Sequence, residues 1–215
     1  LGLGLAYGYL YLMNMMDQSI KSVEQAEKVL QLPVLAAVPV SEINGKPTGS
    51  RLVMIESPNS TCSEAFRSLR VNIESMTRKK SHKVVLFTSS LPSEGKTFTS
   101  INYASSLAQQ GHRTLLIDMD LRKPAVGPEF KLGDEYVGVS DLLQSEDKLK
   151  QFPDLAIYEA AEKLFVLHGG SHISNPSEHI SGSAIEELIL KARQNCDRIV
   201  IDSAPLGPIG DTLSV

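Results

Sequence analysis

The sequence predicts a doubly wound, mostly parallel α/β sheet, because short apolar runs alternate with helical patterns and three of these runs end in polar residues suited to phosphate or metal. The runs and the residues that follow them are 84–87 with Gly-Lys-Thr at 95–97, 114–117 with Asp118 and Asp120, and 198–201 with Asp202. The carboxyl ends of parallel strands meet at one edge of a sheet. We therefore expect a phosphate-binding and metal-binding site at that edge.

The composition is that of a globular protein with one α/β core: 215 residues, 42% of them hydrophobic and 21% charged. A net charge of −4 gives no reason to expect nucleic acid as a partner. Cys62 and Cys196 lie far apart in the sequence, which favours a reducing compartment over a disulfide framework. His168, His172 and His179 lack carboxylate or cysteine partners, so hydrogen-bonded or solvated histidines are favoured over a metal site.

Residues 1–16 carry no charge, and Tyr7, Tyr9 and Tyr11 are suited to a membrane interface. A full span takes about 20 apolar residues, so we expect this stretch to be the end of a transmembrane helix. A buried helix or strand is the alternative. Since the chain begins with Leu1 and stops soon after a strand, we interpret it as a piece of a longer protein.

Residues 17–60 are expected to form a juxtamembrane segment and linker. Apolar residues at helical spacing predict an amphipathic helix at its start, with Asp17 or Ser19 as the cap. Residues 41–60 are rich in Asn, Gly, Pro and Ser, which is typical of a linker. The soluble domain is therefore expected to span residues 61–215, truncated before its last strands.

Residues 84–97 have the layout of a P-loop: a buried strand, a polar loop and a helix that opens at Gly-Lys-Thr. A helix N-terminus presents unpaired N–H groups and partial positive charge to phosphate oxygens. Gly95 allows the backbone to approach closely, Lys96 can reach the β- and γ-phosphates, and Thr97 can offer its hydroxyl to Mg²⁺. Ser90 stands where the loose pattern has its first glycine, so a plain solvated helix start is the alternative.

Three carboxylates follow apolar strands: Asp118, Asp120 and Asp202. The first two are expected beside the P-loop, where a metal and an attacking group would lie. Arg122 and Lys123 can offset the negative charge of a nucleotide or substrate. Asp202 is suited to Mg²⁺ through its water shell. One such motif alone would be weak, whereas three in this order predict a nucleotide site.

The remaining elements complete the alternation of helices and strands. They are helices over residues 63–73, 140–152 and 185–196, a strand over 164–167 and a long loop over 125–137. In the first of these helices Glu64, Arg67 and Arg70 recur at intervals of three, so they share one helical face. They form either an ion pair facing solvent or a functional motif.

Residues 115–122, an apolar triplet followed by Asp-x-Asp-x-Arg, resemble the Walker A′ motif of bacterial tyrosine kinases. Residues 199–205 resemble their Walker B motif, and Glu64, Arg67 and Arg70 match their Glu-x-x-Arg-x-x-Arg motif. The first residues resemble the second transmembrane helix and juxtamembrane segment of the polysaccharide chain-length and export proteins fused to such kinases. The resemblance covers essentially the whole chain.

This resemblance implies an ATP-dependent protein tyrosine autokinase, using Mg²⁺, that regulates exopolysaccharide or capsule polymerisation and export. It implies a location at the bacterial inner membrane, with the kinase domain in the cytoplasm. The implied partners are other polysaccharide export or polymerisation proteins and further copies of the chain. Those copies would form a ring through Glu64, Arg67 and Arg70.

The resemblance also assigns roles to individual residues. Lys96, Asp118 and Asp120 are the catalytic candidates: Asp118 would accept the tyrosine proton or share the metal, and Asp120 would support it. Thr97, Asp118 and Asp202 are the candidate Mg²⁺ ligands. The candidate nucleotide-binding residues are Ser93, Glu94, Gly95, Lys96, Thr97, Phe98, Arg122 and Asn175.

Two departures from the family pattern bear on activity. Ser93 replaces the first glycine of the usual Pro-Gly-Glu-Gly-Lys, and a positive φ there would cost a serine about 1 kcal/mol or somewhat more. The tyrosine-rich tail of the family is not in this sequence, and neither Tyr136 nor Tyr158 is predicted as a substrate. A MinD/ParA-type switch ATPase is one alternative, although Leu91 stands where that group has an extra lysine. A non-catalytic ATP-binding scaffold of the export machinery is the other.

Overall fold

The computed structural model describes residues 6–9, 11, 20–40, 42–43, 46–47, 50–77, 84–133, 135–154, 156–171, 173 and 181–207. The chain forms two compact units, Leu1–Ala37 and Val38–Val215. Each unit is considered by itself below.

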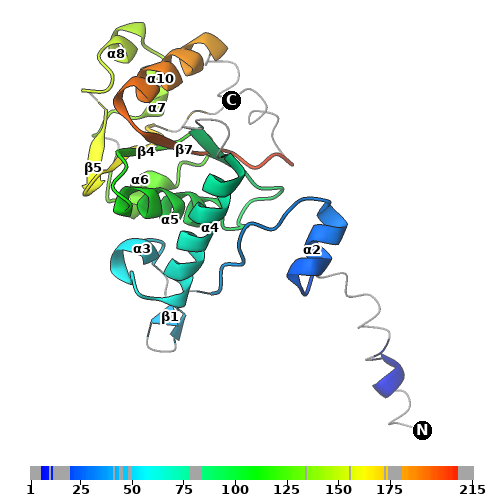
Figure 1. The fold of residues 1–215 in the computed structure, drawn as a ribbon. Coiled ribbons are helices and arrows are strands. Elements are labelled where there is room, and N and C mark those ends of the chain that lie inside the picture. Colours follow the sequence, from blue (N-terminus) through cyan, green and yellow to red (C-terminus); the bar gives the residue numbers. More distant parts are fainter. Residues whose placement is uncertain are drawn as a thin grey trace. The chain divides into compact units, whose positions relative to one another are not determined.

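The first unit contains the helix α2, Val23–Leu30 (Figure 1). Ser22 caps it, with the side-chain oxygen accepting a hydrogen bond from the backbone N–H of Gln25, whereas the expected caps Asp17 and Ser19 lie outside the described residues. No helix within the described ranges is long and apolar enough to cross a bilayer. Most of the stretch 1–16 lies outside those ranges, so the expected membrane helix stays a prediction.

The second unit is built on a five-stranded sheet, which confirms the predicted fold class. Its spatial order is β3 (Val84–Phe87), β7 (Arg198–Asp202), β4 (Thr114–Asp118), β6 (Leu164–Leu167) and β5 (Tyr158–Ala161). The first four strands run parallel, and β5 is antiparallel to β6. In the register of β4 and β7, Asp118 lies opposite Asp202, so the sheet itself brings the two predicted strand-end carboxylates together.

Strand β5 was not predicted from the sequence. It joins β6 through a short turn in which Lys163 adopts φ 61°. Glycine and asparagine are the usual residues at such left-handed turn positions, and here neither is present to indicate a hairpin. Because the residues between β5 and β6 show no turn pattern, the sequence did not predict the short strand β5.

Helices cover both faces of this sheet (Figure 1). Helices α4 (Thr61–Thr77) and α5 (Lys96–Gln109) pack together on one face, and α7 (Val139–Leu143), α8 (Glu146–Lys150) and α10 (Gly182–Asn195) lie on the other. Side chains alternate along a strand, so Leu115 and Ile117 of β4 enter the buried cluster beneath α7 and α10 while Leu116 faces the side of α5. The core thus holds the start of α5 at the carboxyl edge of the sheet.

The helix expected over residues 140–152 is two helices instead. Helix α7 ends at Leu143, and Ser145 caps α8 by accepting a hydrogen bond from the backbone N–H of Lys148. A serine that bonds the backbone in this way starts a new helix rather than continuing the old one. The loop expected over residues 125–137 likewise contains a short helix, α6 (Val126–Glu129).

The linker expected over residues 41–60 contains a folded part of the second unit. A two-strand pairing of β1 (Glu42–Ile43) and β2 (Lys46–Pro47) is followed by a short helix, α3 (Val53–Glu56). Val53 and Met54 are buried, and the backbone N–H of Met54 donates to Oδ1 of Asn102 in α5 at 2.9 Å. The second unit therefore begins well before residue 61, because α3 packs against α5.

Candidate active site

The P-loop lies between β3 and α5, as the sequence predicted. Gly95 precedes the helix with φ 85°, and Ser93 adopts φ 68°. The position that departs from the family pattern therefore does require a left-handed backbone, which is strained for serine. Oε2 of Glu94 braces the loop by accepting hydrogen bonds from the backbone N–H groups of Ser90 and Leu91 at 2.9 and 3.1 Å.

The first two side chains of α5 meet the strand-end carboxylates. Nζ of Lys96 lies 2.9 Å from Oδ1 of Asp202 and 3.5 Å from Oδ2 of Asp120. Thr97 donates its hydroxyl to Oδ2 of Asp202 at 2.7 Å. The lysine side chain is 8% exposed, so these contacts form in a largely water-excluded place where charges interact strongly. Four candidates from three separate stretches of sequence are thus brought together.

Asp118 lies at the end of β4, as expected, and its carboxylate accepts hydrogen bonds from the loop that follows. Its Oδ1 accepts a hydrogen bond from the backbone N–H of Asp120, and its Oδ2 accepts from those of Ala125 and Val126, both at 2.9 Å. Burial raises the pKa of Asp118 to about 7 and the nearby charge of Asp202 adds to the rise, while the three N–H groups oppose it. The carboxylate of Asp118 therefore holds the loop after β4 in place.

Asp202 is fully buried at the end of β7. Burial raises its pKa, while the charge of Lys96 and the hydrogen bonds from Thr97 and Lys96 act in the opposite direction. Within the described ranges, no group of three or more His, Cys, Asp or Glu residues is arranged to hold a metal ion. The oxygens of Thr97, Asp120 and Asp202 nevertheless suit Mg²⁺, which takes one or two protein carboxylates and completes its shell with water and substrate phosphates.

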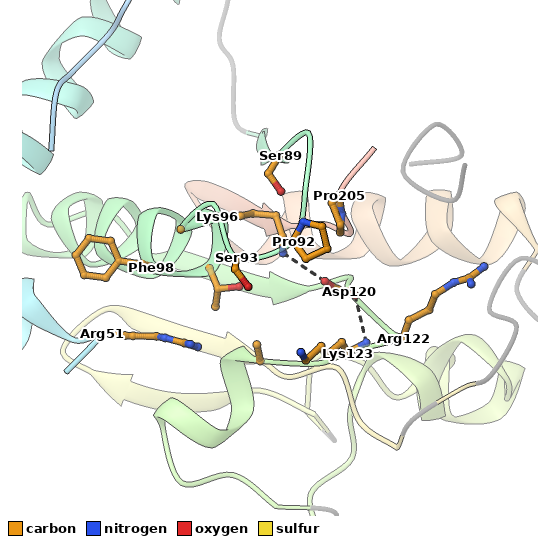
Figure 2. A pocket seen from close by; sticks show the side chains of 13 residues that line it. Arg51, Ser89, Pro92, Ser93, Lys96, Phe98, Asp120, Arg122, Lys123 and Pro205 are labelled. Carbon is orange, nitrogen blue, oxygen red and sulfur yellow. Dashed lines mark hydrogen bonds and ion pairs between the residues drawn. The ribbon is translucent and has the colours of Figure 1, made fainter. Parts of the chain in front are cut away.

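A cavity of about 350 Å³ opens in front of this cluster (Figure 2). Its lining residues are Arg51, Ser89, Pro92, Ser93, Gly95, Lys96, Thr97, Phe98, Asp120, Arg122, Lys123, Ala125 and Pro205. Six of the predicted nucleotide-binding residues are among them. Of the other two, Glu94 braces the P-loop and Asn175 lies outside the described residues. Arg51 was missed because it belongs to the segment predicted as a linker.

The Glu-x-x-Arg-x-x-Arg residues of α4 make contacts within the unit. Arg67 pairs with Glu64 and also donates to the backbone oxygen of Pro58 at 2.7 Å. Arg70 donates to the backbone oxygen of Ser106 at 2.6 Å, which ties α4 to α5. The expected ion pair on this face is therefore present, and a role in assembly stays a prediction.

His168 is buried and hydrogen-bonded, one of the two arrangements that the sequence favoured over a metal site. The backbone N–H of Gly170 donates to Nδ1 at 3.2 Å, so the proton sits on Nε2, which donates to the backbone oxygen of Tyr136 at 3.1 Å. His172 and His179 lie outside the described residues. Cys62 and Cys196 are buried, and neither forms a disulfide bond.

Comparison with known proteins identifies the family. Residues 85–199 match the model of the CobQ/CobB/MinD/ParA nucleotide binding domain. The tyrosine-protein kinase YwqD of Bacillus subtilis (strain 168) is 36% identical over 171 residues, which cover 77% of this chain and 70% of YwqD. The chain belongs to the bacterial tyrosine kinases. The match to YwqD separates this kinase from the MinD and ParA proteins that share its nucleotide-binding domain.

Two further relatives extend the comparison. The structure of the kinase domain of the Escherichia coli tyrosine kinase ETK superposes on this bacterial tyrosine kinase with a TM-score of 0.79 at 25% identity, covering 92% of this chain and 78% of the ETK domain. The succinoglycan biosynthesis transport protein ExoP of Rhizobium meliloti (strain 1021) is 33% identical over 166 residues. Those residues are 74% of this chain but only 20% of ExoP.

Proposed function

We propose that this bacterial tyrosine kinase is an ATP-dependent protein tyrosine autokinase that regulates exopolysaccharide or capsule polymerisation and export. The observation that carries the proposal is the cluster of Lys96, Thr97, Asp120 and Asp202 at the start of α5, facing the cavity. Phosphoryl transfer asks mainly for positioning and for stabilisation of charge on the phosphate oxygens. This cluster supplies both.

The backbone N–H groups at the start of α5 and the ammonium of Lys96 bind the phosphates of ATP. Thr97 and Asp202 would hold Mg²⁺, which would supply charge neutralisation at the phosphate oxygens. Asp120 lines the cavity beside Lys96 and accepts the proton of the tyrosine hydroxyl. We assign Asp118 a positioning role, because its carboxylate is fully buried and three of its lone-pair positions accept backbone hydrogen bonds from the loop after β4.

The proposal extends to assembly and location. Glu64, Arg67 and Arg70 lie on α4, and the side chain of Glu64 is 67% exposed, so it is accessible to a second copy of the chain. Copies in a ring would present tyrosines to each other's active sites. We place the protein at the inner membrane through the segment 1–16, with the kinase unit in the cytoplasm and other polysaccharide export proteins as partners. The transport function in the name of ExoP supports this context.

One observation favours a second candidate function, an ATP-binding scaffold without turnover. Ser93 holds φ 68° in the P-loop, and that strain lowers the stability of the nucleotide-binding conformation. A scaffold of this kind would bind ATP and respond to it without transferring phosphate.

The deciding experiment uses the full-length protein incubated with ATP and Mg²⁺ and probed for phosphotyrosine. We expect phosphotyrosine in the parent and its loss in Lys96→Met and Asp120→Asn. Lys150→Met, which removes an exposed ammonium from α8, is the matched control and should retain the signal. ATP binding without phosphotyrosine in the parent would refute the kinase and leave the scaffold.

A further inference from the structure

We propose that Arg51 is a further nucleotide-binding residue, whose guanidinium contacts the phosphates of ATP in the cavity. This inference rests on the proposed function and deepens it, because it adds to the P-loop a cation from the segment directly before α3. Arg51 lines the cavity, and Figure 2 shows its side chain extending into the cavity from the side opposite Pro205.

The backbone at Arg51 is fixed to the same helix that carries the P-loop lysine. Nδ2 of Asn102, a fully buried residue of α5, donates to the backbone oxygens of Arg51 and Phe98, both at 2.8 Å. Oδ1 of the same amide accepts from the backbone N–H of Met54 at 2.9 Å. A single buried side chain thus joins the segment before α3 to the first turns of α5. The position of Arg51 relative to the phosphate-binding end of α5 is therefore set before any ligand binds.

The charge of the cavity wall favours a polyanion. Among the described residues that line the wall, four side chains are cationic, namely those of Arg51, Lys96, Arg122 and Lys123, and one is a carboxylate, that of Asp120. Lys96 is paired with Asp202 deep in the site. A chain of phosphates entering the cavity therefore meets more positive than negative charge, and a guanidinium at the cavity wall strengthens that field.

The guanidinium of Arg51 has N–H donors that can bind a phosphate in addition to its contact with Glu129. Its Nη1 pairs with Oε1 of Glu129 in α6 at 3.1 Å, and its side chain is 47% exposed. A guanidinium carries five N–H donors in a fixed fork, so one contact to Glu129 orients it without occupying it. The same fork binds phosphate oxygens in pairs, which an ammonium does not do.

A purely structural role for Arg51 makes a different prediction. If Arg51 served only the ion pair with Glu129, removing either partner would have the same effect, and that effect would be on stability alone. If Arg51 binds phosphate, only its own replacement weakens ATP binding. Arg51→Gln and Glu129→Gln therefore separate the two roles, since each substitution breaks the pair but only one removes the cation.

The experiment measures the affinity of the full chain for a fluorescent ATP analogue in the presence of Mg²⁺. We expect Arg51→Gln to weaken binding roughly 10- to 100-fold, the effect of losing a hydrogen-bonded charge on a ligand. Arg51→Lys should fall between that variant and the parent, and Glu129→Gln should bind ATP as tightly as the parent or more so. Arg113→Gln, which removes an exposed arginine packed on Phe165 at the amino end of β4, should leave affinity unchanged.

Parent-like ATP affinity in Arg51→Gln would overturn the proposal, and so would an equal loss in Glu129→Gln. Thermal unfolding of each variant shows whether a weakened site reflects a damaged fold, and Arg51→Lys supplies the comparison if Arg51→Gln unfolds. Lys96→Met distinguishes the proposed role of Arg51 from the proposed kinase function. Loss of ATP binding in Lys96→Met with parent-like binding in Arg51→Gln would refute the role of Arg51 while leaving the kinase intact.

Discussion

The hydroxyl of Thr97 donates a hydrogen bond of 2.7 Å to Oδ2 of Asp202, and this contact joins the first turn of α5 to the end of β7. Oδ1 of the same carboxylate lies 2.9 Å from Nζ of Lys96. Strand β7 lies between β3 and β4 in the sheet, so its aspartate sits centrally at the edge where the P-loop and the Asp-x-Asp loop meet. Because the carboxylate of Asp202 contacts both Thr97 and Lys96, removing its negative charge would change the charge balance of the whole site.

We predict that Asp202→Asn abolishes the gain in ATP affinity that Mg²⁺ provides and lowers phosphoryl transfer by about 100-fold or more. The amide keeps the shape and one acceptor but loses the charge that pairs with Lys96 and that, on the proposed function, would attract Mg²⁺. ATP titrations with Mg²⁺ or with EDTA, together with the initial rate of phosphotyrosine formation, measure both effects. Asp154→Asn, at an exposed position, is the control, and parent-like Mg²⁺ dependence in Asp202→Asn would remove Asp202 from the site.

Ser93→Gly should stabilise the protein. Ser93 adopts φ 68°, a conformation that glycine reaches without steric cost, so we expect the free energy of unfolding to rise by about 0.5–1 kcal/mol. Urea denaturation measures the change. Ser90→Gly is the matched control, because Ser90 is not among the described residues with positive φ, and glycine there should lower stability. A fall in stability for Ser93→Gly would mean that this φ carries no strain.

Glu94→Ala should loosen the P-loop. Its Oε2 accepts hydrogen bonds from the backbone N–H groups of Ser90 and Leu91, and alanine frees both. We expect faster hydrogen exchange at those two amides and ATP affinity lower by roughly 3- to 10-fold, the equivalent of one lost hydrogen bond. Exchange measured by NMR tests the first effect. Glu162→Ala, in the exposed turn before β6, should change neither quantity. Unchanged exchange in Glu94→Ala would show that the loop holds its shape without the brace.

Asp118 gives the nucleotide-free protein a defined pH dependence. Its pKa rises from an ordinary value of 3.8 to about 7 on folding, so between these limits the folded state binds a proton that the unfolded chain has lost. The free energy of unfolding must therefore fall as pH rises from about 4 to 7, by at most about 1.4 kcal/mol per pH unit from this group.

Urea denaturation at several pH values tests this dependence in the parent and in Asp118→Asn. The variant loses hydrogen bonds and is less stable at low pH, but its stability should no longer fall through this window on account of residue 118. Asp147→Asn, an exposed residue of α8, should keep the slope of the parent. A slope in Asp118→Asn equal to that of the parent would assign the pH dependence to other groups.

The parts of the site that sequence predicts are those encoded locally. The apolar run 84–87 and the Gly-Lys-Thr that follows specify a strand, a turn and a helix N-terminus within one short stretch, and the structure contains all three. Asp202 was predicted for the same reason, since it directly follows the apolar run 198–201. Parallel pairing of the strands then places these ends together without further information.

The parts that sequence did not predict depend on contacts between distant residues. The sequence places Asp118 at a strand end, but it does not show that the N–H groups of Ala125 and Val126 turn back onto its carboxylate. Arg51 was missed because the Gly-, Pro- and Ser-rich composition of residues 41–60 conceals a pair of core residues. Nothing near Arg51 indicates that Asn102, in a helix predicted for other reasons, bonds its backbone.

The segment around α3 offers the most direct test of where the kinase unit begins. Met54 is fully buried, and its backbone oxygen accepts a hydrogen bond from Nε2 of Gln109 at 2.8 Å, while its neighbour Ile55 is 38% exposed. We predict that Met54→Ala lowers the free energy of unfolding by about 2–4 kcal/mol, as expected for a core cavity, and that Ile55→Ala lowers it by less than about 1 kcal/mol.

Urea denaturation of both variants and the parent measures the difference. Because Met54 lies three residues after Arg51, loosening of α3 should also weaken ATP binding in Met54→Ala, although this side chain does not line the cavity. If residues 50–57 were a linker outside the fold, both alanine variants would unfold and bind ATP like the parent. A loss of stability confined to Met54→Ala would therefore establish that the segment that carries Arg51 is part of the kinase core.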